Sequence, residues 1–100
     1  LMGNVEFWYA EDYPEKTGSG LILDVRGPHE FERWHIHGAR NIPLGRLRKQ
    51  LGELQKDKPV YIYCQVGFRS YLAYRILKQN GFKNAATLAG GAITFRGYHP

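Results

Sequence analysis

The sequence of 100 residues contains only one cysteine, Cys64, and this scarcity limits what the chain can be. A single cysteine cannot form a disulfide within the chain, so the fold must rest on its apolar core. A reactive thiol that has no partner also indicates a reducing compartment, because an oxidising one would capture it. We therefore expect a cytoplasmic protein.

Other features are missing as well. No apolar run is long enough to cross a bilayer, and no internal repeat or low-complexity tract is present. No Gly-x-Gly-x-x-Gly motif follows a strand pattern, so no dinucleotide site is recognisable. The net charge of +5 is only moderately basic, which suits small anionic substrates or anionic partner surfaces as well as nucleic acid.

Short apolar runs alternate with segments of helical periodicity, which predicts an α/β domain with a mainly parallel central sheet and helices on both faces. The segment 44–54 illustrates the helical pattern, because four leucines repeat along it at helical spacing. Strands are expected at 5–9, 21–25, 39–42, 59–63 and 86–88, and helices at 28–34, 44–54, 70–80 and 92–95.

Cys64 occupies the most informative position, directly after the buried strand pattern 59–63 and before a helix. Backbone N–H groups converge at such a junction, Gly67 lets the loop curl, and Arg69 adds a positive charge. These features favour an ionised, nucleophilic sulfur. The alternative is that Cys64 is a small buried apolar residue at a strand end. The catalytic candidate is Cys64, and the candidate anion-binding loop is Gln65, Val66, Gly67, Phe68, Arg69 and Ser70.

Several short motifs, in a fixed order and spacing, make the segment from Leu21 to Phe95 resemble a rhodanese domain, the sulfurtransferase fold. The motifs are Leu23-Asp24-Val25-Arg26, Glu30-Phe31, His35-Ile36-His37-Gly38-Ala39-Arg40-Asn41-Ile42-Pro43, Val60-Tyr61-Ile62-Tyr63-Cys64 with Gly67 and Arg69, and Leu88-Ala89-Gly90-Gly91. The resemblance implies that the cysteine takes a sulfur atom from a donor, carries it as a persulfide and passes it to an acceptor nucleophile.

The same resemblance assigns supporting positions to Asp24 and Arg26 near the site. We expect both to be structural, with Asp24 tying loops together and Arg26 paired with Glu30 or another nearby carboxylate. The partners implied are a small-molecule sulfur donor and a thiol acceptor. This chemistry needs no metal and no cofactor within the domain.

The loop and the helix after it are most similar to rhodanese domains at the C-terminus of flavin-dependent disulfide and persulfide reductases. We therefore expect residues 1–100 to be one rhodanese-like domain excised from a longer chain, with FAD, NAD(P)H and coenzyme A belonging to the remainder. Many thiosulfate-using members have a basic residue where this chain has Gln65. Together with the apolar Val66 and Phe68, this favours an organic persulfide as the donor.

Three alternatives stay open at the level of sequence. Cell-cycle dual-specificity phosphatases share the fold of the family that this chain resembles, but they have five residues between cysteine and arginine, whereas four separate Cys64 from Arg69. The shorter loop suits a sulfur atom better than a phosphate. A non-catalytic docking or sulfur-carrier module of a fused reductase is the second alternative, although silent modules of this family usually lack the cysteine. Arsenate reduction is the third.

The histidines and the basic residues suggest further sites that we consider weaker. His35 and His37 are one residue apart, but no second cysteine or carboxylate set completes a metal site, so we expect structural or surface histidines. A group of basic residues is interpreted as a solvated face, with an acidic partner second and nucleic acid a distant third. Its members are Arg46, Arg48, Lys49, Lys56 and Lys58.

Overall fold

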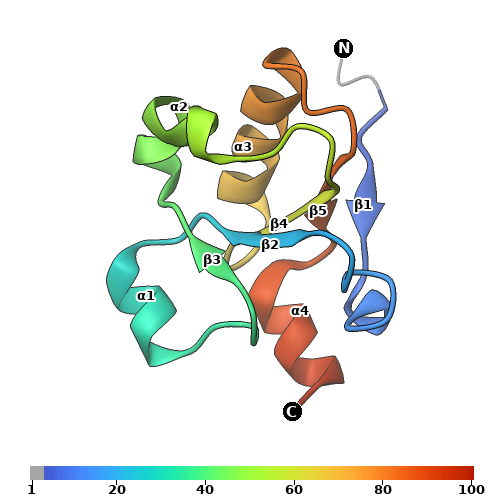
Figure 1. Cartoon of the computed structure of the whole chain (residues 1–100). Helices are drawn as coiled ribbons and strands as arrows, with labels where there is room; N and C mark the ends of the chain where they lie inside the picture. The colour runs from blue at the N-terminus through green and yellow to red at the C-terminus, as the bar shows by residue number, and fades with distance from the viewer. Residues whose placement is uncertain (1–3) are drawn as a thin grey trace.

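The computed structural model describes residues 4–100, which form a single α/β domain around a parallel sheet (Figure 1). Within these residues the sheet has five strands in the order β1-β5-β4-β2-β3, and every neighbouring pair is parallel. The predicted fold class is confirmed. The strands are β1 (Phe7–Trp8), β2 (Leu21–Asp24), β3 (Arg40–Asn41), β4 (Val60–Tyr63) and β5 (Ala85–Leu88).

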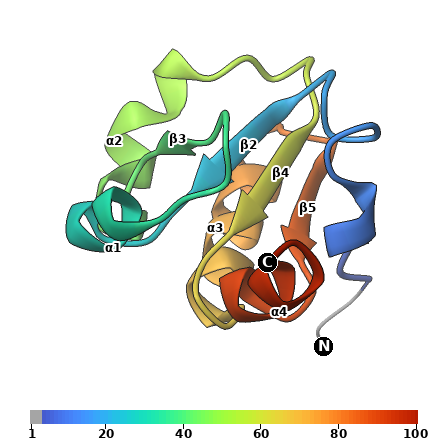
Figure 2. The ribbon, with the colours of Figure 1, turned by 90° about the horizontal axis from the view of Figure 1, so that it is seen from below.

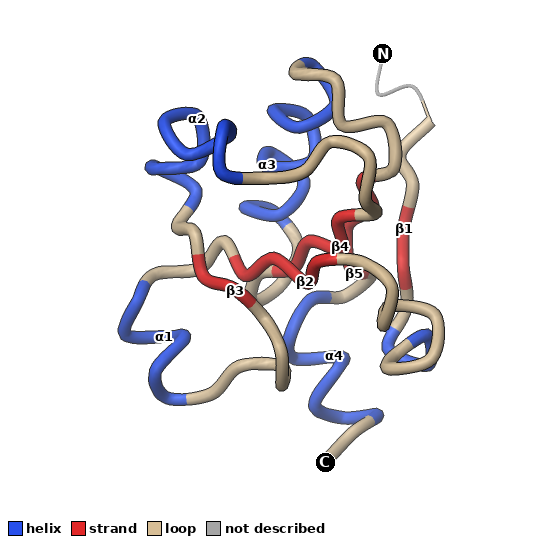
Figure 3. The backbone as a smooth tube through the Cα atoms, in the orientation of Figure 1, coloured by secondary structure: helices blue, strands red, loops and turns tan. Residues whose placement is uncertain are grey.

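Helices cover both faces of the sheet, as predicted. Helices α2 and α3 lie on one face, and α1 and α4 lie on the other (Figures 1 and 3). Seen from the α1 and α4 side, β2, β4 and β5 run in the same direction (Figure 2). The helices are α1 (Pro28–Arg33), α2 (Leu47–Gln50), α3 (Phe68–Gln79) and α4 (Gly91–Tyr98), with 3-10 turns η1 (Ala10–Asp12), η2 (Leu44–Arg46) and η3 (Leu51–Glu53).

The sheet separates two apolar cores, and strand alternation decides which core each side chain enters. Along β4, Ile62 joins the core that also contains Ala73 and Leu77 of α3. Tyr63, the next residue, joins the core that contains Phe95 of α4. Successive side chains of a strand point to opposite faces. Cys64 continues this alternation, so its side chain is buried on the α3 side.

The segment 44–54 departs from the prediction of one amphipathic helix. It consists of η2, the single turn α2 and η3. The predicted apolar face of this segment is nevertheless present, because Leu47 and Leu54 are buried in the α3-side core. Glycine costs about 1 kcal/mol in a helix interior relative to alanine, and Gly45 and Gly52 both fall in this segment. Burial of the leucines therefore holds the segment in place although its helix is interrupted.

Smaller differences affect the ends of elements. Strand β1 covers only Phe7–Trp8 of the predicted 5–9, because it lies at the sheet edge and pairs with β5 alone. Helix α4 extends to Tyr98, beyond the expected 92–95. Among residues 4–100 no helix is both long enough and apolar enough to cross a membrane.

Candidate active site

The site is built around the turn that connects β4 to α3. Cys64 follows β4 directly, and α3 begins at Phe68, two residues before the predicted start at Ser70. Gly67 has a φ of 118°, a left-handed conformation that glycine adopts without a steric penalty. This lets the chain turn sharply enough for the first residues of α3 to face back toward Cys64. The turn lies at the carboxyl edge of a parallel sheet, where ligands of such folds usually bind.

Two backbone N–H groups point at the sulfur of Cys64. The N–H of Gly67 donates to Sγ at 3.1 Å, and the N–H of Ser70 donates at 3.2 Å. Main-chain donors that converge in this way stabilise an anionic sulfur. The structure thus places two members of the predicted N–H set on the sulfur, while the anion-binding roles of Gln65, Val66, Phe68 and Arg69 stay predictions.

Two buried hydroxyl groups lie behind the sulfur. Ser70 Oγ is 3.5 Å from Cys64 Sγ and donates to the carbonyl of Gly67 at 3.1 Å. Thr87 of β5 donates its hydroxyl to Ser70 Oγ at 2.8 Å. Sequence reasoning missed Thr87. The sequence feature that could have identified it is a polar residue at a core-facing position of a strand. Thr87 lies two residues after the buried Ala85 and therefore shares the α3 face.

Helix α4 holds the loop from its other side. The N–H groups of Ala92 and Ile93 donate to the carbonyls of Cys64 and Gln65 at 2.8 and 3.2 Å. Gly91 makes the approach possible, because a Cβ atom there would lie 2.4 Å from the carbonyl oxygen of Gln65. The start of α4 therefore anchors the outer carbonyls of the loop.

Arg69 does not reach the sulfur with its guanidinium group, because both terminal nitrogens bind Glu30 of α1. Its two hydrogen bonds to the carboxylate measure 2.8 and 3.0 Å. These bonds, helped by the N–H of Gly27, lower the pKa of Glu30 to about 2. Glu30 and, more weakly, Cys64 raise the pKa of Arg69. Arg69 therefore contributes its charge beside the site, positioned by Glu30.

Asp24 and Arg26 form a buried ion pair of 2.8 Å at the end of β2. Asp24 also accepts the backbone N–H of Arg26, and the guanidinium donates to the carbonyl of Trp34 at 2.6 Å. The expectation that Asp24 ties a loop agrees with this geometry. Of the two pairings expected for Arg26, the one with another nearby carboxylate is present, because Asp24 is only two residues away, whereas Glu30 binds Arg69 instead. A weaker contact of 3.4 Å joins Arg26 to Gln65 Oε1.

The sulfur is covered from solvent, while the loop above it is not. Cys64 is 1% exposed, whereas Val66 and Phe68 are 63% and 68% exposed. The apolar rim predicted from Val66 and Phe68 is therefore present.

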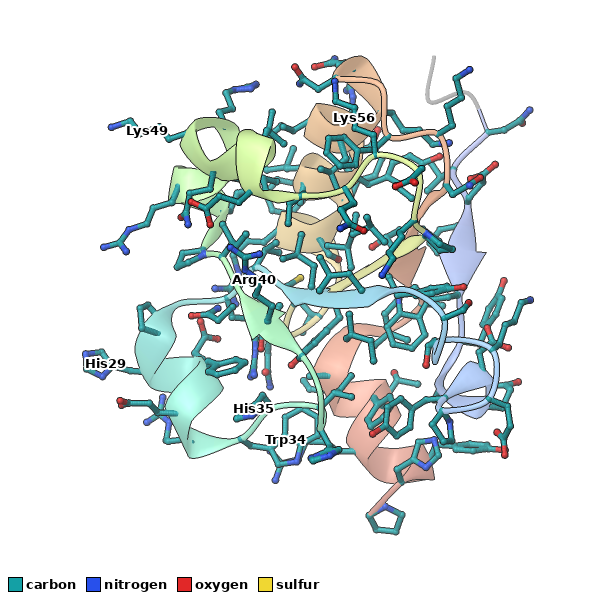
Figure 4. The ribbon with its side chains drawn as sticks, viewed as in Figure 1. His29, Trp34, His35, Arg40, Lys49 and Lys56 are labelled. Atoms are coloured by element: carbon teal, nitrogen blue, oxygen red, sulfur yellow. The ribbon has the colours of Figure 1, made fainter. Side chains whose placement is uncertain are left out.

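The remaining candidates lie away from this loop. His35 and His37 are exposed and lie in the loop after α1, and the ring of His35 stacks on Phe31 with centroids 3.7 Å apart. Among residues 4–100 no three His, Cys, Asp or Glu side chains gather as metal ligands would. The side chains of Lys49 and Lys56 lie on the far side of the sheet from Trp34 (Figure 4). The five basic residues of the predicted face are all exposed.

Comparison with known proteins assigns the family. The family model described as "Rhodanese-like domain" matches residues 9–95, so the chain belongs to the rhodanese-like domain family. It is 34% identical over 80 residues to the thiosulfate sulfurtransferase GlpE of Coxiella burnetii, covering 80% of this chain and 75% of GlpE.

Two proteins of Bacillus subtilis are also similar. The uncharacterized protein YqhL is 50% identical over 81 residues, which are 81% of this chain and 64% of YqhL. The putative sulfur carrier protein YrkF is 41% identical over 76 residues, which are 76% of this chain and 41% of YrkF. The chain thus spans less than two thirds of either relative.

Solved structures that are similar to this chain include rhodanese domains within reductases. The reduced CoADR-RHD of Bacillus anthracis superposes with a TM-score of 0.84 at 36% identity, over 91% of this chain and 16% of that one. The NAD-dependent persulfide reductase of A. fulgidus gives a TM-score of 0.74 at 34% identity, over the same two fractions.

Proposed function

We propose that this domain is a sulfurtransferase that works through a persulfide on Cys64. The observation that carries the proposal is the pair of N–H groups, from Gly67 and Ser70, that converge on Sγ. The same donors that stabilise the thiolate would stabilise the terminal sulfur of a persulfide, which is also an anion. Membership of the rhodanese-like family and the similarity to GlpE support the assignment.

The reaction proceeds in two substitutions at sulfur. In the first, the Cys64 thiolate attacks the sulfane sulfur of a donor, the new S–S bond forms, and the donor leaves as sulfite from thiosulfate or as a thiolate from an organic persulfide. In the second, an acceptor thiolate attacks the outer sulfur, takes it as its own persulfide and releases the Cys64 thiolate. No net oxidation or reduction occurs, and no cofactor is needed in the domain.

The loop supports sulfur transfer over phosphoryl or arsenate chemistry. A phosphate bound in the loop would need several oxygens to be coordinated, yet Cys64 is buried and Arg69 is engaged by Glu30. The apolar rim of Val66 and Phe68 supports an organic persulfide as the donor rather than thiosulfate. A reducing compartment, the cytoplasm, suits a thiol that must stay free.

A second candidate role is that of a sulfur carrier, fused or docked to a flavin-dependent reductase. It is favoured by the 41% identity to YrkF and by the rhodanese-like structures found within much longer chains. In such a parent protein, FAD, NAD(P)H and coenzyme A would bind to the other domains. A carrier would accept sulfur on Cys64 but release it only to its partner.

Intact mass spectrometry tests the proposal. After incubation with thiosulfate or glutathione persulfide, the protein should gain the mass of one sulfur atom, and addition of a small thiol should remove it. Cys64→Ser should keep the fold and gain no sulfur, because a hydroxyl cannot carry a sulfane atom. Retention of the sulfur in the presence of small thiols would favour the carrier role, and hydrolysis of an aryl phosphate without any sulfur adduct would overturn both roles.

A further inference from the structure

A cavity beside the Cys64 loop is not used by the reaction described above. It opens between the loop, α1 and α4, on the face of the sheet opposite to α3. In Figure 4, Trp34 lies between α1 and α4 at this face. The cavity is lined by Arg26, Glu30, Arg33, Trp34, Gln65 and Arg96.

The lining carries positive charge that the surrounding carboxylates do not neutralise. Asp24 is committed to Arg26, and Glu30 is committed to Arg69. Arg33 and Arg96 are both exposed, and within residues 4–100 neither has a carboxylate within ion-pair distance. Two guanidinium groups with free donors therefore face the same opening, and an arginine fork matches the oxygens of a carboxylate or phosphate.

Trp34 orders this cationic group. The guanidinium carbon of Arg96 lies 4.8 Å from the centre of the Trp34 ring, and that of Arg26 lies 5.7 Å from it. A cation over an aromatic face is held there by the ring quadrupole. The arrangement keeps Arg96 over the ring and gives the cavity one flat apolar surface beside its charges.

The cavity is connected to the Cys64 loop by short contacts. Gln65, which lines it, follows Cys64 in sequence and accepts a hydrogen bond from Arg26 at 3.4 Å. Helix α4, which carries Arg96, donates to the carbonyl of Cys64 through Ala92. The cavity therefore adjoins the loop that carries Cys64.

We propose that this cavity binds the anionic tail, a carboxylate or a phosphate, of a low-molecular-weight thiol whose sulfur exchanges with Cys64. The inference rests on the proposed sulfurtransferase function and specifies its substrate class. The tail docks at Arg33 and Arg96, the sulfane sulfur moves from the persulfide R–S–S⁻ to the Cys64 thiolate, and R–S⁻ leaves. The same tail site serves the acceptor thiol in the reverse direction.

Binding can be measured without any chemistry by using the Cys64→Ser protein. The chain has two tryptophans, and Trp8 is buried, so a change of fluorescence on titration reports on Trp34. The probes are S-methylglutathione for a carboxylate tail and S-methyl phosphopantetheine for a phosphate tail. The S-methylglutathione diethyl ester, which has no carboxylate, is the control. We expect at least one anionic probe to bind and the ester not to respond, with binding weakened by salt.

Variants then locate the site. Arg33→Gln and Arg96→Gln should each weaken probe binding roughly two- to fivefold, the range expected for exposed ion pairs. Arg48→Gln, an exposed arginine on α2 at the other face, is the matched control and should change nothing. In the active protein, the same two substitutions should raise KM for glutathione persulfide by that factor and leave KM for 2-hydroxyethyl persulfide unchanged.

The outcomes separate this inference from the function on which it rests. Sulfur transfer with unchanged KM in both arginine variants, or no Trp34 response to either anionic probe, would contradict the proposal that the cavity binds an anionic tail. Probe binding that depends on Arg33 and Arg96, in a protein that never gains sulfur on Cys64, would support the binding site but contradict the proposed sulfurtransferase function. Loss of the signal in Trp34→Phe confirms the origin of the readout.

Discussion

At the scale of single residues, the sulfur of Cys64 depends on hydrogen bonds that come from its own loop. Gly67 and Ser70 donate main-chain N–H groups to it. The Ser70 hydroxyl is close enough to turn from the Gly67 carbonyl to an ionised sulfur. Thr87 supports this movement, because its own proton occupies one acceptor site of Ser70 Oγ and leaves the Ser70 proton free to donate.

Thr87→Val tests the contribution of this hydroxyl. The substitution keeps the shape of the side chain but removes the donor to Ser70, so we expect sulfur transfer to slow by roughly two- to tenfold, the range for one net hydrogen bond. Thr87→Ser should restore the rate. The measurement is single-turnover transfer from glutathione persulfide. Equal rates for Thr87→Val and the unsubstituted protein would contradict a role of the Thr87 hydroxyl in transfer.

The ion pair of Arg69 and Glu30 predicts a pH dependence of stability. The folded-state pKa of Glu30 is lowered to about 2 from 4.5, so the pair contributes its full stability above pH 4.5 and loses it as the pH falls toward 2. Both side chains are partly exposed, which limits the contribution to about 0.5–1 kcal/mol.

Glu30→Gln should therefore lower the free energy of unfolding by this amount at pH 7, and the difference from the parent should shrink as the pH falls from about 4.5 to 2. Urea unfolding at several pH values measures it. Glu32→Gln is the matched control, because Glu32 lies on the same helix and is 78% exposed, and among residues 4–100 its one ion-pair contact is with His29 at 3.8 Å. A Glu30→Gln deficit that stays constant across this pH range would show that the charge pair is not its source.

At the scale of elements, the site depends on the contact between the Cys64 loop and the first turn of α4. The contact is backbone to backbone, so it does not depend on side-chain identity except at Gly91. There the φ is 67°, and the carbonyl of Gln65 occupies the position of a Cβ atom. Any side chain at this position must move the loop or the helix.

Gly91→Ala should therefore destabilise the domain by about 2 kcal/mol or more and reduce sulfur transfer, since it combines an unfavourable φ with a backbone clash. Gly97→Ala is the control in the same helix, because a Cβ atom at Gly97 would meet nothing within 4 Å and alanine favours helix. It should be neutral or stabilising by up to about 1 kcal/mol. Thermal unfolding compares the two, and equal Tm values would contradict the packing argument.

At the scale of the whole molecule, the edge strand β1 is tied to the centre of the sheet by one buried side chain. Trp8 is 2% exposed, and its indole N–H donates to the carbonyl of Ile62 in β4 at 2.9 Å. Its ring also contacts Tyr61 and Phe95 edge to face. Trp8 therefore links the N-terminal strand with β4 and with α4 in one core.

Trp8→Phe should lower the free energy of unfolding by about 1–3 kcal/mol, because it leaves a void and removes the hydrogen bond from the indole to the carbonyl of Ile62. Phe7→Leu is the control, since Phe7 is 50% exposed and its change should stay within about 0.5 kcal/mol. Urea unfolding with an unchanged m-value would show that the domain still unfolds as one unit. A Trp8→Phe protein as stable as the parent would mean that β1 contributes little to the core.

The amino-acid sequence by itself determined the α/β class, the approximate place of every strand and the position of Cys64 between a strand and a helix. These features are local, because hydrophobic periodicity, glycine and proline act within a few residues along the chain. The resemblance to the rhodanese family was also visible in the sequence, because it rests on short motifs and their order along the chain. The prediction of a continuous helix over 44–54 was wrong, because periodicity indicates which side chains are buried and not whether the backbone between them stays helical.

Only the tertiary structure decided which side chains meet. Glu30, Thr87 and Gly91 lie on three different elements, and the parallel sheet brings all three to the edge where Cys64 lies. A carboxylate chooses among the arginines near it by distance and direction, which sequence spacing does not contain. The pairing of Arg69 with Glu30, the hydroxyl pair behind the sulfur and the cationic cavity beside it therefore became visible only when the elements were packed together.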